Sequence, residues 1–405
     1  CVRRESADNF RAGNRVRAGV SPLFLSKKSG FAAKACKLLT FGVKKYIMIA
    51  NKRGTKMNAF LSKKAQGIAP YVAGEQPKDK KYVKLNTNEN PYPPSPKAVQ
   101  ALRAFEADSL KLYPAPDSFA LREAIAAAEG VRPENVFCGN GSDEILALCF
   151  PAFFDADGTG AAFADVTYSF YPVFAAFFGI PHTIVPLEED FTLDLSKLTA
   201  TDAQGLIVAN PNAPTGIGIP LREMEAFVAQ NGRRVVIIDE AYMPFFGESA
   251  VPLTKKYKNL LIVKTFSKGY SLAGIRCGYA IGDEELIAGL ERCKDCFNSY
   301  PVDRICQAVC AASIADAEYF AAMTSLVVSE RERLSDGLRA RGFFVLPSKA
   351  NFVFAKHEQK GGREVYEALR ARGVLVRYFA KPRISEFCRI TVGSAEENDA
   401  LLAAL

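Results

Sequence analysis

The sequence predicts an α/β fold, with a large domain built on a mostly parallel sheet and a smaller α+β domain after it. Apolar, β-branched runs alternate with helical segments from about residue 82, which is typical of a parallel sheet covered on both faces. A long helical stretch then covers residues 302–341, and after Gly342 short strands alternate with two helical stretches. A chain of 405 residues is long enough for two such domains.

The strands expected in the large domain are short apolar runs that end at glycines, prolines or helical segments. They cover residues 136–138, 160–164, 182–185, 205–209, 235–238, 260–263 and 278–281. In the smaller domain we expect strands over 343–346, 351–355, 374–377 and 389–392, and helices over 361–372 and 395–405. We therefore assign residues 58–85 to an N-terminal segment of the small domain, 86–301 to the large domain and 302–405 to the small C-terminal domain.

Residues 1–57 are predicted to be a basic leader ahead of these domains. Residues 1–56 contain 14 Lys and Arg against Glu5 and Asp8, which leaves 38 basic and 42 acidic residues in the rest of the chain. The leader's composition fits a transit peptide, a nucleic-acid or membrane-surface arm, or a gene start placed too early. We favour the last, with Met57 as the start, and expect the leader to be poorly packed and to take no part in catalysis. The mildly acidic body predicts no nucleic-acid partner.

The cysteine and histidine content argues against several kinds of site. Ten cysteines do not indicate a disulfide scaffold here, and Cys293-Lys-Asp-Cys296 lies in a helical pattern without a second pair. We therefore predict no metal site and a reducing, cytoplasmic compartment. His182 and His357 are the only histidines, which nearly excludes a zinc hydrolase or a Ser-His-Asp enzyme. The longest uncharged stretch, residues 166–187, is interrupted by three prolines and a glycine, so we predict no membrane span.

Lys268 is the strongest candidate catalytic residue. It ends the segment Leu261-Ile-Val-Lys-Thr-Phe-Ser-Lys268, and a lysine amine forms a Schiff base with an aldehyde cofactor when its pKa is lowered. Ser267 and Arg276, on the same segment, are donors that a phosphate group needs. Asp239 ends the apolar run Val235-Val-Ile-Ile-Asp239, where it would keep a pyridine nitrogen protonated and so let the ring act as an electron sink.

Two turns beside strand ends favour ligand binding. Gly139-Asn-Gly141-Ser142-Asp143 lies between a strand and a helix start, where backbone N–H groups and the helix dipole attract an anion such as a phosphate. Asn210-Pro-Asn212-Ala213-Pro-Thr-Gly216 follows another strand, at the edge where open α/β sheets bind ligands.

Together these motifs resemble the histidinol-phosphate aminotransferases, a family of fold-type I pyridoxal-phosphate enzymes, from about Gly67 to the C-terminus. Further matching segments are Ile68-Ala-Pro-Tyr71, Leu85-Asn-Thr-Asn-Glu-Asn-Pro91, Leu112-Tyr113-Pro, Val166-Thr-Tyr168, Asn298-Ser-Tyr-Pro301 and Phe387-Cys-Arg389-Ile-Thr-Val-Gly393. The resemblance implies transamination between L-histidinol phosphate and 2-oxoglutarate, which gives imidazole acetol phosphate and L-glutamate in histidine biosynthesis. It also implies pyridoxal 5′-phosphate as the cofactor.

The resemblance implies roles for individual residues as well. Lys268 would bind the cofactor covalently and move the proton between Cα and C4′. Around the ring, Asp239 would pair with the pyridine nitrogen, Tyr242 would contact the phenolic oxygen and Tyr168 would stack on the face. The cofactor phosphate would be held by Gly141, Ser142, Asp143, Thr265, Ser267 and Arg276. The substrate would be bound by Tyr71, Asn351, Arg377 and Arg389.

Two further positions bear on the cofactor. Tyr113 looks like the tyrosine that family members lend to the neighbouring subunit's cofactor phosphate, which implies a homodimer with two shared sites. Many relatives have Asn directly before the Pro-Thr-Gly, whereas this chain has Ala213 there and Asn212 one residue earlier. Either Asn212 turns in to reach the phenolic oxygen, or Tyr242 carries that contact with water.

The substrate is suggested by two arginines near the C-terminus. Guanidinium groups bind phosphate and carboxylate in a bidentate manner, so Arg377 and Arg389 suit both histidinol phosphate and glutamate. An aromatic-amino-acid aminotransferase or a threonine-phosphate decarboxylase on the same scaffold would use the same lysine, aspartate and arginines, and is the alternative. A non-catalytic regulator with a DNA-binding arm is disfavoured, because the leader has no helix-turn-helix pattern and Lys268 is present.

Overall fold

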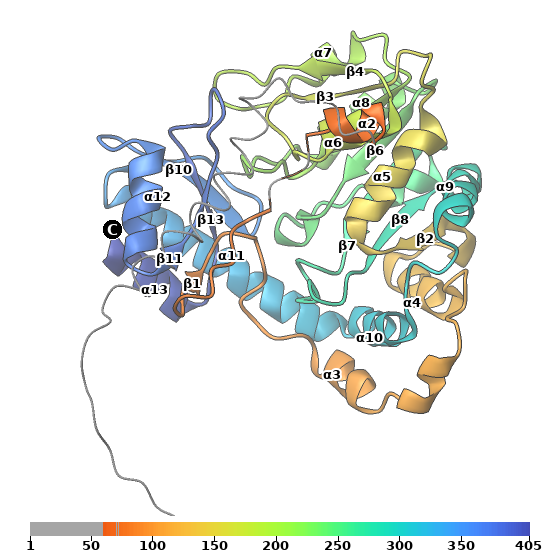
Figure 1. Ribbon diagram of the computed structural model, residues 1–405, viewed down its shortest axis with the longest axis horizontal. Helices are drawn as coiled ribbons and strands as arrows, with labels where there is room; N and C mark the ends of the chain where they lie inside the picture. Colours follow the sequence, from red (N-terminus) through yellow and green to blue (C-terminus); the bar gives the residue numbers. More distant parts are fainter. Residues whose placement is uncertain (1–59, 70, 72) are drawn as a thin grey trace, which may run out of the picture. The chain divides into compact units, whose positions relative to one another are not determined.

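A computed structural model describes residues 60–405 apart from residues 70 and 72 (Figure 1). The predicted leader, residues 1–57, lies outside the described residues. The chain divides into two units, residues 1–66 and 67–405. The described part of the first unit contains the start of the short helix α2 (Lys63–Gly67), and the second unit contains every strand described below.

A seven-stranded sheet forms the centre of the larger domain. Its order is β2-β8-β7-β6-β5-β3-β4, and neighbouring strands are parallel except that β8 is antiparallel to both β2 and β7. The strands are β2 (Val136–Gly139), β3 (Ala161–Ala164), β4 (His182–Val185), β5 (Gly205–Ala209), β6 (Val235–Asp239), β7 (Leu260–Thr265) and β8 (Gly278–Gly282). They coincide with the seven predicted runs, so the mostly parallel sheet is confirmed.

Successive residues of a central strand enter opposite halves of the core. In β6, Val236 and Ile238 pack into the apolar cluster on one face and Ile237 into the cluster on the other, and all three are fully buried. A strand buried on both faces needs an unbroken apolar sequence, which is why the run is continuous rather than alternating. Burying a side chain such as Ile237 contributes about 1.5–3 kcal/mol.

Helices cover both faces of this sheet. One face packs against α3 (Pro96–Arg103), α4 (Phe119–Glu129), α7 (Leu195–Thr199), α8 (Leu221–Gln230) and α10 (Arg304–Ile314). The other packs against α5 (Gly141–Phe153), α6 (Tyr171–Phe178) and α9 (Glu284–Phe297). Short 3₁₀ turns lie at Ala107–Lys111, Pro133–Asn135, Met243–Phe245 and Val251–Lys255.

The smaller domain combines two small sheets with three helices. An antiparallel sheet has the order β12-β13-β10-β9, and β1 pairs in parallel with β11. The strands are β1 (Val83–Lys84), β9 (Phe343–Val345), β10 (Phe352–His357), β11 (Val374–Leu375), β12 (Arg377–Tyr378) and β13 (Cys388–Thr391), and the helices are α11 (Ala317–Arg339), α12 (Gly362–Ala371) and α13 (Ala395–Ala404). The single strand predicted over 374–377 is thus two, because its first half pairs with β1 and its second with β13.

Helix α10, which begins just after the boundary predicted at residue 302, packs on the large sheet. Val309 and Cys310 pack into the core of the large sheet, and the helix lies against α3 and α4. Helix α11 is bent by 80° from α10 and packs on β9 and α13. The domain boundary itself stays a prediction. No single helix of the described residues is long and apolar enough to cross a membrane; α10 and α11 meet those criteria only as this bent pair.

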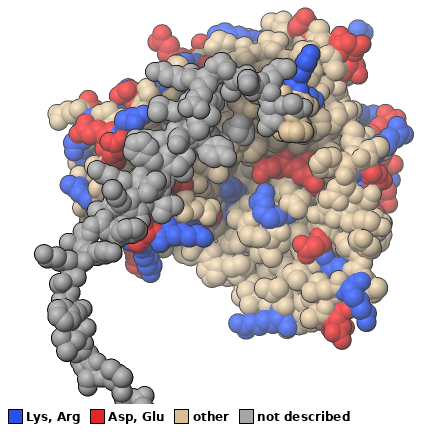
Figure 2. Space-filling model, in the orientation of Figure 1, with Lys and Arg blue, Asp and Glu red and all other residues tan. Residues whose placement is uncertain are grey.

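The two histidines lie at the ends of strands. His182 begins β4 and is exposed, and His357 ends β10 and is half-buried. On the face shown in Figure 2, acidic and basic side chains lie interspersed, which agrees with the nearly balanced charge of the body.

Candidate active site

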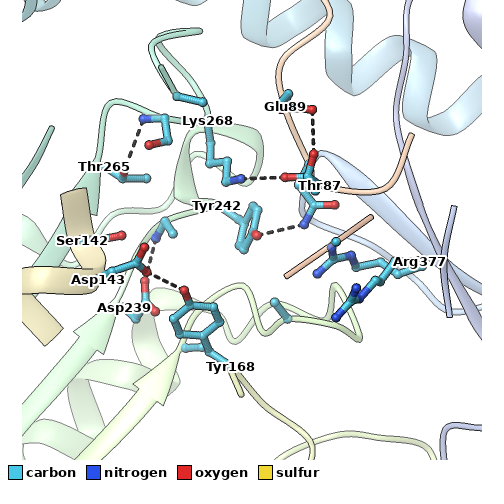
Figure 3. A pocket seen from close by; sticks show the side chains of 18 of the residues that line it. Thr87, Glu89, Ser142, Asp143, Tyr168, Asp239, Tyr242, Thr265, Lys268 and Arg377 are labelled. Carbon is cyan, nitrogen blue, oxygen red and sulfur yellow. Dashed lines mark hydrogen bonds between the residues drawn. The ribbon is translucent and has the colours of Figure 1, made fainter. Parts of the chain in front are cut away.

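Most of the predicted site residues meet at one cavity of about 210 Å³ (Figure 3). Its lining includes residues at the carboxyl ends of β5, β6 and β7, where open α/β sheets bind ligands. The strand ends of a parallel sheet lie side by side, so residues far apart in sequence are brought together. The predicted residues that line the cavity are Tyr71, Ser142, Asp143, Tyr168, Asp239, Tyr242, Thr265, Ser267, Lys268, Arg276, Arg377 and Arg389.

Lys268 is half-buried and lines this cavity. Its Nζ donates to the carbonyl oxygen of Thr87 at 3.0 Å and lies 5.9 Å from the centre of the Tyr242 ring. Burial, reinforced by the charge of Arg389, lowers the pKa of Lys268 to about 8. About a tenth of the amine is then neutral at pH 7, and the neutral amine is the form that attacks an aldehyde.

Asp239 is a buried carboxylate without a cationic partner. Its Oδ2 accepts a hydrogen bond from the Tyr171 hydroxyl at 2.8 Å and its Oδ1 from the backbone N–H of Ala241 at 3.1 Å. Among the described residues no Lys or Arg forms an ion pair with it, and burial raises its pKa to about 6 despite the two hydrogen bonds. A protonated pyridine nitrogen would supply the missing positive charge, so this residue fits the expected cofactor.

The N-terminus of α5 meets Arg276 at the other end of the cavity. Arg276 donates to Ser267 Oγ at 3.4 Å and to Asp143 Oδ2 at 3.2 Å, while the Ser267 N–H donates to Thr265 Oγ1 at 3.1 Å. Gly141 has φ +76°, and a Cβ there would lie 2.6 Å from Arg276 Nη2, so glycine lets the guanidinium lie against the helix start. Gly141 itself does not line the cavity. A helix N-terminus, a guanidinium and hydroxyls are the donors that a cofactor phosphate needs.

Tyr168 and Tyr242 flank the space between these two ends. The Tyr168 hydroxyl donates to Asp143 Oδ1, and the Tyr242 hydroxyl accepts from Asn88 Nδ2 at 2.9 Å. Burial raises the pKa of both phenols, so they stay protonated at neutral pH. The Tyr242 O–H is therefore a hydrogen-bond donor for an oxygen in the cavity.

The N-terminal segment contributes residues whose roles the sequence did not reveal. Besides bonding Tyr242, Asn88 accepts from the Thr391 hydroxyl at 3.1 Å through its Oδ1. Asn351 donates to the backbone oxygen of Asn88 at 3.0 Å and does not line the cavity, so in this structure it positions Asn88. The contact of Asn351 with substrate stays a prediction. The only sequence signal for Asn88 was its place in the segment 85–91.

Arg377 and Arg389 face each other across neighbouring strands. They are register partners in the β12–β13 pair. Arg389 donates to the Asn86 oxygen at 3.0 Å, but its buried Nε has no hydrogen-bond partner, and Arg377 donates to the Ala73 oxygen at 3.1 Å. Like charges directly opposite each other are unfavourable, and burial lowers the pKa of Arg389. An anion between the two guanidinium groups would remove both penalties.

Two predicted residues point away from the cavity of their own chain. The Asn212 side chain donates to the Val166 oxygen and to Thr215 Oγ1, both at 2.9 Å, and so stabilises its own turn. Ala213 lines the wall there, and a contact of Asn212 with the phenolic oxygen stays a prediction beside the alternative that Tyr242 makes it. Tyr113 is 79% exposed and stacks on Tyr300, with 4.7 Å between ring centres.

Comparisons with known proteins agree with this geometry. The model of the family "Aminotransferase class I and II" matches residues 80–405. The histidinol-phosphate aminotransferase of Acinetobacter baumannii (strain AB307-0294) is 49% identical over 354 residues, which cover 87% of this chain and 98% of that protein. The one from Marinomonas sp. (strain MWYL1) is 47% identical over 351 residues, covering 86% and 99%. The crystal structure of the Sinorhizobium meliloti histidinol-phosphate aminotransferase in complex with pyridoxal-5′-phosphate is 25% identical, with a TM-score of 0.78, covering 86% of this chain and 97% of that one.

Proposed function

Because the chain belongs to the histidinol-phosphate aminotransferases, within the class I and II aminotransferase family, we propose that it transfers the amino group of L-histidinol phosphate to 2-oxoglutarate in histidine biosynthesis. The products are imidazole acetol phosphate and L-glutamate. Pyridoxal 5′-phosphate, when bound, supplies a protonated ring that withdraws electrons from the substrate Cα. The residues around the cavity divide the remaining tasks.

Lys268 carries the proton transfer. Its lowered pKa leaves part of the amine neutral, so Nζ would hold the cofactor through its aldehyde and would take and return the proton at the substrate Cα. Asp239 would pair with the pyridine nitrogen, and Tyr171 fixes the orientation of that carboxylate. Tyr242 would donate to the phenolic oxygen, and Asn88 holds its hydroxyl in place. Tyr168 would cover one face of the ring.

The phosphate of the cofactor is assigned to the α5 end of the cavity. Backbone N–H groups at Ser142 and Asp143, the hydroxyls of Ser267 and Thr265, and Arg276 would hold it. These donors are fixed before binding by their mutual hydrogen bonds, so little side-chain entropy is lost when the anion arrives.

The substrate assignment depends above all on the Arg377–Arg389 pair. Two opposed guanidinium groups, one of them with an unpartnered buried Nε, suit a dianionic phosphate ester in one half reaction and a carboxylate in the other. Tyr71 lines the same cavity and adds a hydroxyl.

The proposal is tested by a half-reaction assay on the chain loaded with pyridoxal phosphate. Histidinol phosphate, phenylalanine and threonine phosphate are added separately, and the absorbance band of the bound cofactor is followed. Fast conversion by histidinol phosphate supports the proposal. Faster conversion by phenylalanine would assign an aromatic aminotransferase, and release of carbon dioxide from threonine phosphate a decarboxylase. No conversion by any amine would contradict an aminotransferase function.

We further propose that the working unit is a homodimer in the cytoplasm, with Tyr113 reaching the partner's cofactor phosphate. Tyr113 is exposed on its own chain beside Leu110 and Leu112, which are 53% and 57% exposed. A mixture of Tyr113→Ala and Lys268→Ala chains tests the shared site. Random exchange gives each mixed dimer one intact site, so activity should return to about a quarter of the wild-type value. A mixture no more active than its parents would contradict the sharing of Tyr113.

A further inference from the structure

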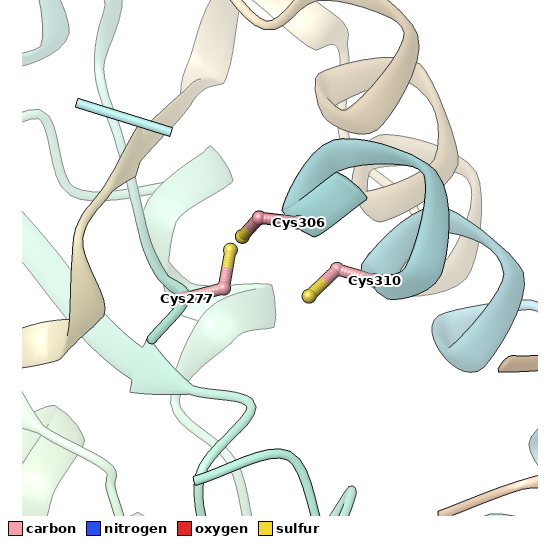
Figure 4. A group of neighbouring side chains, drawn as sticks. All are labelled: Cys277, Cys306 and Cys310. Carbon is pink, nitrogen blue, oxygen red and sulfur yellow. The ribbon is translucent and has the colours of Figure 1, made fainter. Parts of the chain in front are cut away.

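Three cysteine thiols lie together on the face of the large sheet away from α5 (Figure 4). The sulfur atoms of Cys277, Cys306 and Cys310 are all within 4.8 Å of one another. Cys277 directly precedes β8, and Cys306 and Cys310 lie on successive turns of α10, where a spacing of four residues places side chains on one face. All three are free thiols and at most 2% exposed.

The spacing of the sulfurs is close to that of a three-coordinate metal–thiolate site. Metal–sulfur bonds of about 2.3 Å place three sulfurs around one ion roughly 4.0 Å apart. The cluster therefore needs to contract by less than about 1 Å to surround an ion. In contrast, ordinary apolar packing does not require three sulfurs from two separate elements to converge on one point.

The position of Cys306 suits a thiolate ligand. Cys306 lies in the first turn of α10, at the positive end of the helix dipole, where negative charge on sulfur is stabilised. The thiolate is the form of cysteine that binds a metal ion.

We propose that Cys277, Cys306 and Cys310 form a binding site for a soft, thiophilic metal ion held by three sulfur ligands, with Cu(I) as the best-matched ion. Thiolates select soft ions. Zinc is disfavoured because it prefers four ligands, and the apolar cluster around these thiols leaves little room for water as the fourth. Binding forms three metal–sulfur bonds, and each thiol that becomes a ligand releases its proton to solvent.

The test uses the full chain with four other cysteines, Cys1, Cys36, Cys293 and Cys296, replaced by serine, so that they do not compete. The reduced protein is titrated with Cu(I) against a competing chelator without oxygen, and X-ray absorption counts the sulfurs around copper. We expect one ion per chain with three sulfur ligands. The variants Cys306→Ser and Cys310→Ser, made on this background, should bind more than about 100-fold more weakly, since even lost outer-shell contacts cost 10–100-fold in metal affinity.

The matched control is Cys149→Ser, which alters an equally buried thiol in the core cluster on the opposite face of the sheet. It should bind Cu(I) as tightly as the background protein. Thermal melting shows which variants fold, and either of the two cluster variants is sufficient for the comparison. The proposal is overturned if the background protein fails to compete with the chelator, if a folded cluster variant binds equally well, or if fewer than three sulfurs surround the copper.

Discussion

Replacing Asp239 by Asn should make the cofactor-free protein more stable while impairing cofactor binding. Burial raises the pKa of Asp239 from 3.8 to about 6. A rise of this size means that, at neutral pH, the charged carboxylate lowers the free energy of unfolding by about 3 kcal/mol. Asn carries no charge but has one acceptor oxygen, so one of the two hydrogen bonds, from Tyr171 or Ala241, is lost at a cost of about 1 kcal/mol. The expected net stabilisation at pH 7.5 is about 2 kcal/mol.

The sign of the pH dependence follows from the direction of the shift. A raised folded-state pKa contributes stability that is complete below pH 3.8 and is lost as the pH rises through about 6. The advantage of Asp239→Asn over wild type should therefore be absent near pH 4, grow between pH 4 and pH 6, and stay constant above pH 7. Denaturant unfolding of the cofactor-free proteins across this range measures it directly.

Asp194→Asn is the matched control. Asp194 is an exposed carboxylate at the N-cap of α7, and its hydrogen bonds with Ser196 lower its pKa, the opposite direction. Its substitution should bring no gain at pH 7.5. Adding pyridoxal phosphate should raise the stability of wild type more than that of Asp239→Asn. If Asp239→Asn were less stable than wild type at pH 7.5, or if its advantage did not depend on pH, the carboxylate would not be unpaired and buried.

Three other perturbations test the site and the core. Lys268→Ala should fold normally but lose more than about 10³-fold in kcat. In wild type, the rate of cofactor capture should increase as the pH rises through about 8, because the Lys268 amine becomes neutral there. A capture rate that does not depend on pH would contradict this role. Arg389→Ala should raise the KM for both histidinol phosphate and glutamate by about 10–150-fold, because a charge-assisted hydrogen bond worth about 1.5–3 kcal/mol is lost. The control Arg339→Ala, at an exposed arginine, should change neither KM. Unaltered glutamate turnover in Arg389→Ala would refute its role. Ile237→Ala should lower the free energy of unfolding by about 2–5 kcal/mol in denaturant titrations, and a cost below 1 kcal/mol would mean that the strand is not packed on both faces.

The strands were predictable because each central strand is buried on both faces. Such strands have continuous apolar sequences, and no charged residue interrupts the apolar pattern in residues 205–209 or 235–238. The bend between α10 and α11 was not predictable in the same way. The two helices form one helical stretch in the sequence pattern, whereas in the structure they meet at 80° and α10 packs against α3 and α4.

In the site, residues placed by the backbone were predictable and residues placed by side-chain contacts were not. Asp239 and Lys268 follow strands, so the sheet fixes where they lie. Asn88 and Tyr171 matter because each bonds a side chain, 154 and 68 residues away respectively, and no local pattern marks such pairs. Asn212 is a similar case, since the sequence gives its position in the turn but not the direction of its amide, which here bonds within the turn.

The cavity is electrostatically unfavourable in two places, and the two have opposite signs. At the end of β6, Asp239 is a buried anion that no Lys or Arg of the described residues pairs with, and in the small domain Arg377 and Arg389 are opposed cations on paired strands. A core selected only for stability would contain neither. Both penalties are relieved together by a ligand set with a protonated ring nitrogen at one point and an anionic substrate group at another. The free energy that binding recovers at these places therefore favours cofactor and substrate of this charge pattern over neutral molecules of the same shape.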